Sequence, residues 1–176
     1  MVHVVFLRGV NVGGHRRFRP AMLATELRHL GAVNIGAAGT LVIREVIEPA
    51  DLTAELARRL PFDTEIAICP GRDIVRLLAL DVFAGHRPAP AEVRFVSVLV
   101  RPCRSAPLLP LRLPARGRWL VKLVARDRRF VCGVYRRHFK TIGCLGSLDR
   151  LFGVPVTTRN WNTLETIAKV LASDGR

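Results

Sequence analysis

The chain has 176 residues, and its 28 Lys and Arg residues against 14 Asp and Glu residues give it a formal net charge of +14. An apolar fraction of 49% predicts a compact globular protein and excludes a disordered chain. The longest strand-like apolar run, residues 93–100, contains an arginine and is far shorter than the roughly 20 residues of a membrane span. The first residues also lack the pattern of a signal peptide. The sequence therefore predicts a soluble, cytoplasmic protein.

The positive charge is concentrated in the second half of the chain. Residues 1–90 contain 11 arginines and 9 acidic residues, a net charge of +2, whereas residues 91–176 contain 17 basic and 5 acidic residues, a net charge of +12. Such an excess predicts a basic surface that attracts polyanions. A basic surface that keeps the protein soluble, without a partner, is the alternative.

The first part of the chain predicts the element order β-α-β-β-α-β. Apolar residues recur there at the spacing of strands and helices in turn, and prolines and glycines stand at the boundaries. This order is that of the ferredoxin-like arrangement. The predicted elements are a strand at 2–7, a helix from Pro20 to Gly31, two strands within 33–46, a helix from Pro49 to Pro61 and a strand at 64–69.

The second part of the chain predicts a similar order in which a proline-rich connection replaces the first helix. A helix at 71–85 and a proline-rich link at 86–92 come first, and the link predicts a domain boundary. The fold class predicted is α+β, with a ferredoxin-like half at 1–85 and a divergent, basic ferredoxin-like half at 86–176 that includes the C-terminal helix. The later elements are a strand at 92–101, a connection at 102–117, a hairpin at 118–137 that turns near 126–129, a helix at 147–153, a strand at 154–158 and a last helix that Asn162 caps with Glu165.

Two polar stretches follow predicted strands and are candidate ligand sites. In the stretch FLRGVNVGGHRR, glycines could let backbone N–H groups converge on an anion, but their positions match neither dinucleotide-binding nor P-loop spacing. A loop that needs positive φ at its paired glycines is the alternative. In the stretch TTRNWNT, a guanidinium, an amide and a flat ring suit a carboxylate, a phosphate or a base, whereas helix capping and local packing form the structural alternative. The ligand-binding candidates are Arg8, Asn11, Gly13, Gly14, His15, Arg159, Asn160 and Trp161.

The hairpin at 118–137 and the residues after it carry the densest positive charge. Arg118, Lys122 and Arg126 are predicted to alternate onto one strand face. The hairpin matches the strand motif of RNA-recognition folds only loosely, so backbone-driven binding of a polyanion is the better prediction. The anion-binding candidates are Arg118, Lys122, Arg126, Arg128, Arg129, Arg136, Arg137 and Lys140.

Signatures of catalysis are sparse. The serines stand in no GxSxG setting, the histidines show no HxH or HExxH spacing, and no isolated pair of acidic residues suggests acid–base chemistry. The four cysteines form no CxxC pair and are predicted to be reduced, apolar-like residues. No catalytic residue, metal site or cofactor is predicted, and the sequence favours a protein that is not an enzyme.

The same motifs carry a resemblance to a known family. FLRGVNVGGHRR with MLATELRHLGAVNI near the start, and TTRNWNTLETIAKV near the end, are similar to the bacterial domain-of-unknown-function family 1697 over nearly the whole chain. The resemblance implies an α+β fold of two ferredoxin-like halves and implies no established reaction, ligand or cofactor. The family usually has a Gln-Ser-Gly-Asn turn where this chain has Ala37, Ala38, Gly39 and Thr40. Any ligand that relatives bind at that turn could therefore be lost or changed here.

We expect a non-catalytic cytoplasmic protein whose basic second half binds an anionic partner, with nucleic acid as one candidate. A membrane partner is not expected, and the sequence leaves the oligomeric state open. The alternative is a small-molecule site, or an enzyme, formed by the loop from Arg8 to His15 with residues Arg159 to Trp161. That alternative requires the two stretches to lie side by side around a pocket.

Overall fold

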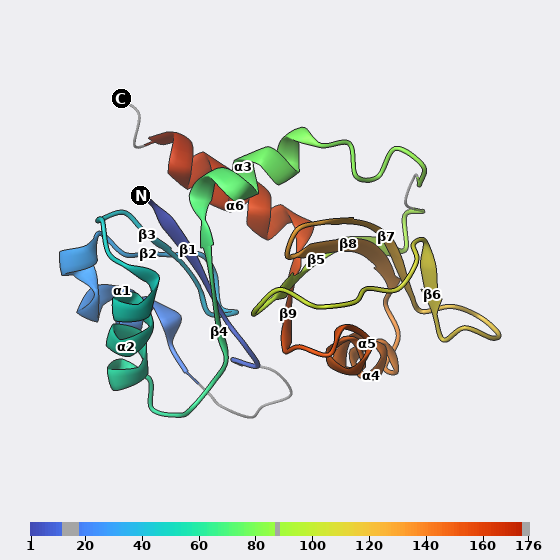
Figure 1. Cartoon of the computed structure of the whole chain (residues 1–176), viewed down its shortest axis with the longest axis horizontal. Helices are drawn as coiled ribbons and strands as arrows, with labels where there is room; N and C mark the ends of the chain where they lie inside the picture. Colours follow the sequence, from blue (N-terminus) through green and yellow to red (C-terminus); the bar gives the residue numbers. More distant parts are fainter. Residues whose placement is uncertain (12–17, 87–88, 174–176) are drawn as a thin grey trace. The chain divides into compact units, whose positions relative to one another are not determined.

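A computed structural model describes residues 1–11, 18–86 and 89–173, which form a mixed α+β structure with two antiparallel sheets (Figure 1). The chain divides into two compact units. The first unit contains Met1–Leu78 and Asn162–Arg176, and the second contains Ala79–Trp161. No helix within the described ranges is long and apolar enough to cross a membrane.

The first unit contains a four-stranded sheet with the strand order β2-β3-β1-β4, in which every neighbouring pair is antiparallel. Strand β1 pairs with both β3 and β4, so it lies inside the sheet and all of its side chains are buried. The elements of this unit are β1 (His3–Leu7), α1 (Pro20–Glu26), the 3-10 turn η1 (Arg28–Leu30), β2 (Val33–Asn34), β3 (Thr40–Ile43), α2 (Pro49–Arg59), β4 (Ile66–Pro70), α3 (Gly71–Ala79) and α6 (Trp161–Ala172).

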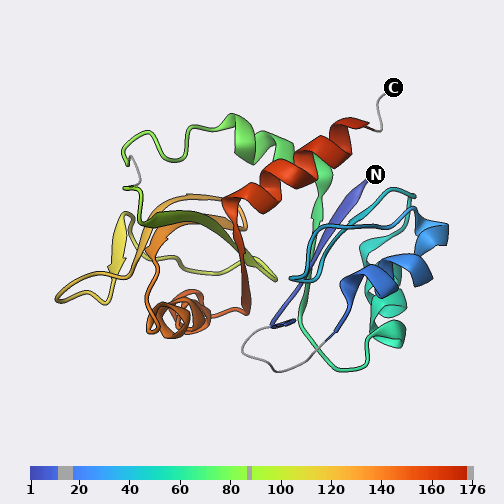
Figure 2. The same ribbon diagram turned by 180° about the vertical axis from the view of Figure 1, so that it is seen from behind.

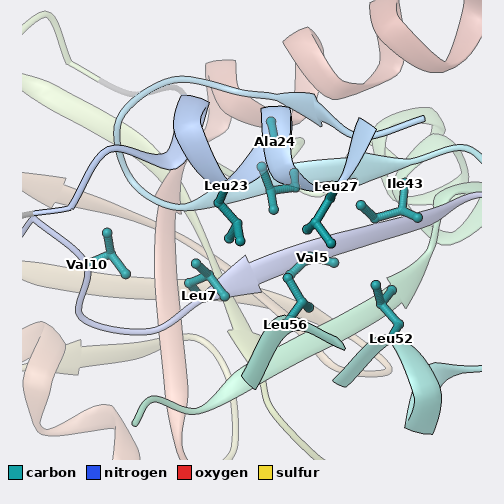
Figure 3. Close-up of a cluster of buried hydrophobic side chains, with 10 residues drawn as sticks. Val5, Leu7, Val10, Leu23, Ala24, Leu27, Ile43, Leu52 and Leu56 are labelled. Atoms are coloured by element: carbon teal, nitrogen blue, oxygen red, sulfur yellow. The ribbon is translucent and has the colours of Figure 1, made fainter. Parts of the chain in front are cut away.

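Helices α1 and α2 cover one face of this sheet with the apolar residues that the sequence pattern predicts. Leu23 and Leu27 from the α1 region, and Leu52 and Leu56 from α2, point toward Val5 of β1 (Figure 3). Both helices have a proline in their first turn, where the missing N–H has no helical partner in any case. Both predicted helices are present, but the first ends at Glu26 and is followed by the 3-10 turn η1, whereas the sequence predicts one helix from Pro20 to Gly31.

Helices α3 and α6 run side by side in both views of the ribbon (Figures 1 and 2). Gly71 begins α3 and leaves room for the side chain of Leu171, whose nearest carbon would lie 3.0 Å from a Cβ at that position. Two predictions need correction here. Helix α3 ends at Ala79 rather than at residue 85, and α6 begins directly after β9, at Trp161, so Asn162 lies within its first turn and is not the cap.

The second unit contains a five-stranded sheet with the strand order β6-β7-β8-β5-β9, also antiparallel throughout. Helices α4 and α5 pack on one face of this sheet (Figure 1). Phe95 and Leu123 on that face, with Leu148 and Phe152 from α5, form its core. The elements are β5 (Glu92–Leu99), β6 (Leu111–Leu113), β7 (Val121–Asp127), β8 (Phe130–Arg136), α4 (Thr141–Gly146), α5 (Leu148–Phe152) and β9 (Val156–Asn160).

Two elements of the second unit are absent from the sequence prediction. Strand β6 lies inside the proline-rich connection, between Pro110 and Pro114, and it occupies the edge of the sheet. Proline is tolerated at an edge because one side of the strand needs no ladder hydrogen bonds. The short helix α4 contains Gly143 and Gly146, which weaken any helical signal in the sequence. The predicted hairpin is confirmed, and it turns at Arg128 and Arg129.

Candidate anion-binding site

The β7–β8 hairpin carries a bulge that separates the predicted row of cations. Leu123 opposes Gly133 and Ala125 opposes Cys132, so one residue of β7 has no partner in β8. Before the bulge Lys122 opposes Val134, and after it Arg126 opposes Val131.

Since Val131 and Val134 are three positions apart on β8, they face opposite sides of the sheet. Lys122 and Arg126 therefore also face opposite sides, and Arg118 precedes the strand altogether. The prediction that these three cations share one strand face is wrong.

Two arginines at the hairpin tip, Arg126 and Arg129, donate from their side chains to backbone carbonyl groups. Arg126 donates from Nε to the carbonyl oxygen of Arg128 at 3.0 Å. Arg129 donates to the carbonyl oxygens of Leu99 at 2.8 Å and Val100 at 2.7 Å. The bonds of Arg129 hold the turn against the end of β5. Arg126 and Arg129, which the sequence predicts to bind an anion, therefore serve to stabilise the hairpin.

A basic pocket of about 490 Å³ lies at the other end of the hairpin. It includes four of the predicted anion-binding residues and adds Arg116 and His138, which the sequence prediction omitted. Arg116 comes from the proline-rich connection, and nothing in its local sequence distinguishes it from the arginines around it. The lining residues are Pro114, Arg116, Arg118, Leu120, Arg136, Arg137, His138 and Lys140.

The charge of this pocket is almost uncompensated. No acidic side chain lines it, and within the described ranges Arg116, Arg118 and Arg137 form no ion pair with a carboxylate. All three of these arginines are exposed. Cations that converge on one hollow attract a multivalent anion. Because these arginines have no carboxylate partner among the described residues, no existing ion pair has to be broken when the anion binds.

Arg136 is the pocket residue with a fixed position. Its guanidinium lies 3.8 Å from the centre of the Trp119 ring and donates to the Trp119 carbonyl oxygen at 3.4 Å. Its Nε also lies 3.5 Å from Oε1 of Glu92, the residue directly opposite it on β5. The ring and the carboxylate hold the guanidinium in place at the wall of the pocket.

Glu92 is a buried carboxylate at the centre of a small polar network. Although burial opposes its ionisation, the Ala89 N–H and the neighbouring His86 and Arg136 hold the pKa of Glu92 below its ordinary value. His86 Nε2 lies 3.1 Å from the carboxylate, and His86 Nδ1 lies 3.2 Å from Nζ of Lys122. A neutral imidazole that donates from Nε2 and accepts at Nδ1 satisfies both contacts. Lys122 therefore belongs to this network and does not line the pocket.

Another basic hollow, of about 520 Å³, lies among the described residues of the second unit. Arg101, Arg104 and Arg150 line it together with Ser105 and the turn after α5. It contains fewer cations than the pocket of Arg118, and none of them is fixed by an aromatic ring. This hollow provides a comparison site in the same unit with the same sign of charge.

The opening loop places Arg8 and Asn11 in the first unit, whereas Gly13, Gly14 and His15 lie outside the described residues. Asn11 has a positive φ of 57°. Its amide nitrogen donates to the carbonyl oxygens of Phe18 at 2.8 Å and Ala37 at 2.7 Å, and its amide oxygen accepts from the Phe18 N–H at 2.9 Å. Both amide protons of Asn11 are therefore used by the backbone, which identifies this side chain as a clamp of the loop.

The second polar stretch forms the end of β9 and the start of α6. Arg159 is buried and donates to Thr157 Oγ1 at 2.8 Å and to the Thr158 carbonyl oxygen at 2.9 Å, and burial lowers its pKa to about 10. Asn160 accepts from the Tyr135 hydroxyl at 3.1 Å. Trp161 is 7% exposed and packs edge-on against a phenylalanine of its own unit, residue 83.

Among the described residues, no group of three or more His, Cys, Asp or Glu side chains gathers where it could hold a metal ion. No disulfide joins the four cysteines, all of which lie within the described ranges. The site that the side chains define is thus a cationic pocket on an α+β protein with two antiparallel sheets.

The chain belongs to the family described as "Protein of unknown function (DUF1697)", whose model matches residues 1–117. This confirms the resemblance found in the sequence. Among solved structures, the chain is similar to the conserved bacterial protein SP0830 from Streptococcus pneumoniae, with 18% identity and a TM-score of 0.60 over 97% of this chain and 98% of that chain. At this identity the similarity concerns the fold alone. A comparison with curated proteins finds no match.

Proposed function

We propose that this protein is a non-catalytic binding protein that holds a phosphate-bearing partner in the pocket lined by Arg118 and Arg137. The observation that carries the proposal is the convergence of four arginines and a lysine on one hollow that no acidic side chain lines. A guanidinium presents a planar fork of donors that matches a phosphate group. Lys140 adds a mobile point charge at the same hollow.

The distribution of charge over the two units supports this proposal. The second unit contains 16 Lys and Arg residues and 4 Asp and Glu residues, a net charge of +12, whereas the first contains 12 and 10, a net charge of +2. Acids of the second unit, among them Glu92 and Asp149, are already used internally. Glu92 pairs with Arg136, and Asp149 accepts from the Val156 N–H at 2.9 Å. An approaching polyanion therefore meets a field of one sign.

The finer architecture belongs to the same proposal. We infer two ferredoxin-like halves divided near residue 86, in a cytoplasmic protein. The strand order β2-β3-β1-β4, with α1 and α2 on one face, supports this for the first half. In the second half the order β7-β8-β5-β9 corresponds to it strand by strand, with β6 added at the edge and a proline-rich connection in place of one helix.

The competing small-molecule site at the opening loop has less support. The amide nitrogen of Asn11, at the centre of this loop, donates both of its hydrogens to backbone carbonyl oxygens. In the second stretch, Arg159 is turned into its own strand and the amide oxygen of Asn160 is held by Tyr135. Among the described residues of that site, Asn11, Arg159 and the amide oxygen of Asn160 are thus already engaged in contacts within the protein.

Titration calorimetry with inorganic polyphosphate tests the proposal without involving any base or sugar. We expect binding near 50 mM salt that weakens steeply as salt is raised, because phosphate contacts release counterions. The double charge reversal Arg118→Glu with Arg137→Glu should weaken binding by at least about tenfold, because each reversal replaces an attraction with a repulsion.

Two matched double reversals serve as controls. Arg28→Glu with Arg72→Glu makes the same change of charge at exposed positions of the first unit and should have little effect. Arg101→Glu with Arg104→Glu makes it at the other basic hollow of the second unit. Absence of binding near 50 mM salt, or equal losses in all three double variants, would show that the Arg118 pocket is not a site.

A further inference from the structure

Phe139 is an exposed aromatic side chain at the rim of the basic pocket. It is 79% exposed, and it is the one aromatic residue among the strongly exposed large apolar residues of the described ranges. Its neighbours in the chain, His138 and Lys140, both line the pocket. A ring that is this accessible contributes little to the hydrophobic core, so folding does not explain its position.

The surroundings of this ring combine a flat surface with positive charge. The His138 ring lies with its centre 4.4 Å from that of Phe139, and Nζ of Lys140 lies 5.6 Å from the ring centre. Arg137 is the preceding pocket cation and is also exposed. A stacking surface next to a cationic hollow is the combination that proteins use for unpaired nucleotides.

We infer that the anionic partner is a single-stranded nucleic acid, with a backbone phosphate in the pocket and the adjoining base stacked on Phe139. This inference rests on the proposed function, which concerns the phosphate, and adds that the protein also contacts a base. The strand must be single because a base in a duplex has no free face for a protein ring. RNA and DNA both offer a backbone phosphate and a base, so either could bind in this way. The experiment compares the affinities of the two.

An anionic membrane surface is the competing occupant of a basic patch with exposed apolar residues. Ile142, 66% exposed, lies at the start of α4, three residues after Phe139, and would insert with it into a bilayer. The geometry favours the nucleic acid because the cations surround a hollow of about 490 Å³ rather than lying on a flat face. A hollow accommodates one discrete phosphate, whereas a membrane surface presents a layer of headgroups.

Fluorescence anisotropy with labelled oligomers of about 10 units separates the base from the phosphate. The probes are single-stranded RNA, single-stranded DNA and an abasic sugar-phosphate chain of the same length. We expect tighter binding of the base-bearing strands, and Phe139→Ala should weaken that binding by roughly tenfold, within the range measured for loss of one stacking ring. The same variant should bind the abasic chain as the unmodified protein does.

Two substitutions control for general effects. Phe139→Trp should retain or strengthen oligonucleotide binding because it keeps a flat ring. Ile142→Ala removes a neighbouring apolar side chain of similar exposure and should leave binding unchanged. Since both positions are exposed, none of these variants should alter unfolding, and circular dichroism melting checks this.

The possible outcomes are separable from those of the proposed function. Equal affinity for abasic and base-bearing strands would overturn this inference while leaving the phosphate pocket intact. Loss of polyphosphate binding would remove both. A membrane partner would give a different result. The protein would bind vesicles of phosphatidylcholine and phosphatidylglycerol, Phe139→Ala and Ile142→Ala would weaken that binding equally, and base-bearing strands would not be preferred. This result would overturn the inference. A difference between RNA and DNA would identify which strand is the partner.

Discussion

Asn11 determines how the opening loop is held, and its contacts allow a sharp test at a single residue. Replacing it with Asp keeps the size and tolerates the positive φ, but a carboxylate cannot donate to the carbonyl oxygens of Phe18 and Ala37. We expect Asn11→Asp to lower the free energy of unfolding by about 1–3 kcal/mol. Asn11→Gly loses the same bonds but relieves the backbone, so it should cost less. Urea unfolding measures both changes.

The matched control for this substitution is Asn162→Asp in the first turn of α6. Asn162 is exposed, and a negative charge near a helix N-terminus is neutral or mildly favourable. Its free energy of unfolding should change by less than about 0.5 kcal/mol. If Asn11→Asp proves as mild as Asn162→Asp, the amide of Asn11 does not clamp the loop.

Glu92 gives a prediction about pH at the residue scale. Since its folded-state pKa lies below the ordinary value of 4.5, the ionised carboxylate stabilises the fold above that pH. This contribution is lost as the pH falls through the folded-state pKa. We expect Glu92→Gln to lower the free energy of unfolding by about 2 kcal/mol near pH 7, and the difference from the unmodified protein to shrink as the pH falls below 4.5. A difference that is constant with pH would mean that charge on Glu92 plays no part.

At the scale of elements, the β7–β8 hairpin depends on a glycine opposite its bulge. A Cβ on Gly133 would clash with the Lys122 carbonyl oxygen and would lie 2.7 Å from the Phe95 ring. Because one obstacle is backbone and the other is a fully buried ring, neither can move away cheaply. Gly133→Ala should lower the free energy of unfolding by about 1–3 kcal/mol, seen as a lower urea midpoint.

Gly143 in α4 is the control for Gly133. Nothing lies within 4 Å of a Cβ at this position, and it is inside a helix, where alanine is preferred to glycine. Gly143→Ala should therefore be neutral or stabilising by up to about 1 kcal/mol. Equal destabilisation by the two substitutions would mean that loss of glycine flexibility, and not the crowding at Gly133, is responsible.

The elements that the sequence predicts well are those with a strong apolar period. Strand β1 is a continuous apolar run, and α2 places Leu52 and Leu56 one turn apart after a proline. Tertiary pairing, which leaves no local signal, explains the failures. The bulge that turns Arg126 away from Lys122 arises from the register with β8, and β6 exists because residues in a proline-rich segment meet β7 at the sheet edge.

The same distinction applies to the candidate site. Charge density alone selects Arg118, Arg137 and Lys140, three residues that line the pocket, because all three stand in the most basic segment. It also selects Arg129, which binds the carbonyl oxygens at the end of β5. The sequence shows how many cations a segment contains, but the group that each cation contacts is determined by the fold. The pocket could therefore be predicted as a region, but its members could not.

For the whole molecule, the unequal charge of the two units has a consequence for stability. A net charge of +12 on the second unit repels itself and opposes folding. Any salt screens this repulsion, but phosphate should also occupy the Arg118 pocket and stabilise the folded protein by mass action. We expect the melting temperature to rise by a few degrees more in phosphate than in chloride of equal ionic strength, as differential scanning fluorimetry would measure.

The double variant Arg118→Glu with Arg137→Glu separates pocket binding from the general salting-out effect of phosphate. That general effect acts on the entire surface and persists in the variant, whereas the contribution of the pocket disappears. The two reversals also lower the net charge of the second unit, so self-repulsion falls and the variant should melt no earlier than the unmodified protein in chloride. A smaller phosphate increment in the variant thus cannot come from a weaker fold. An undiminished increment would mean that phosphate does not bind in the pocket.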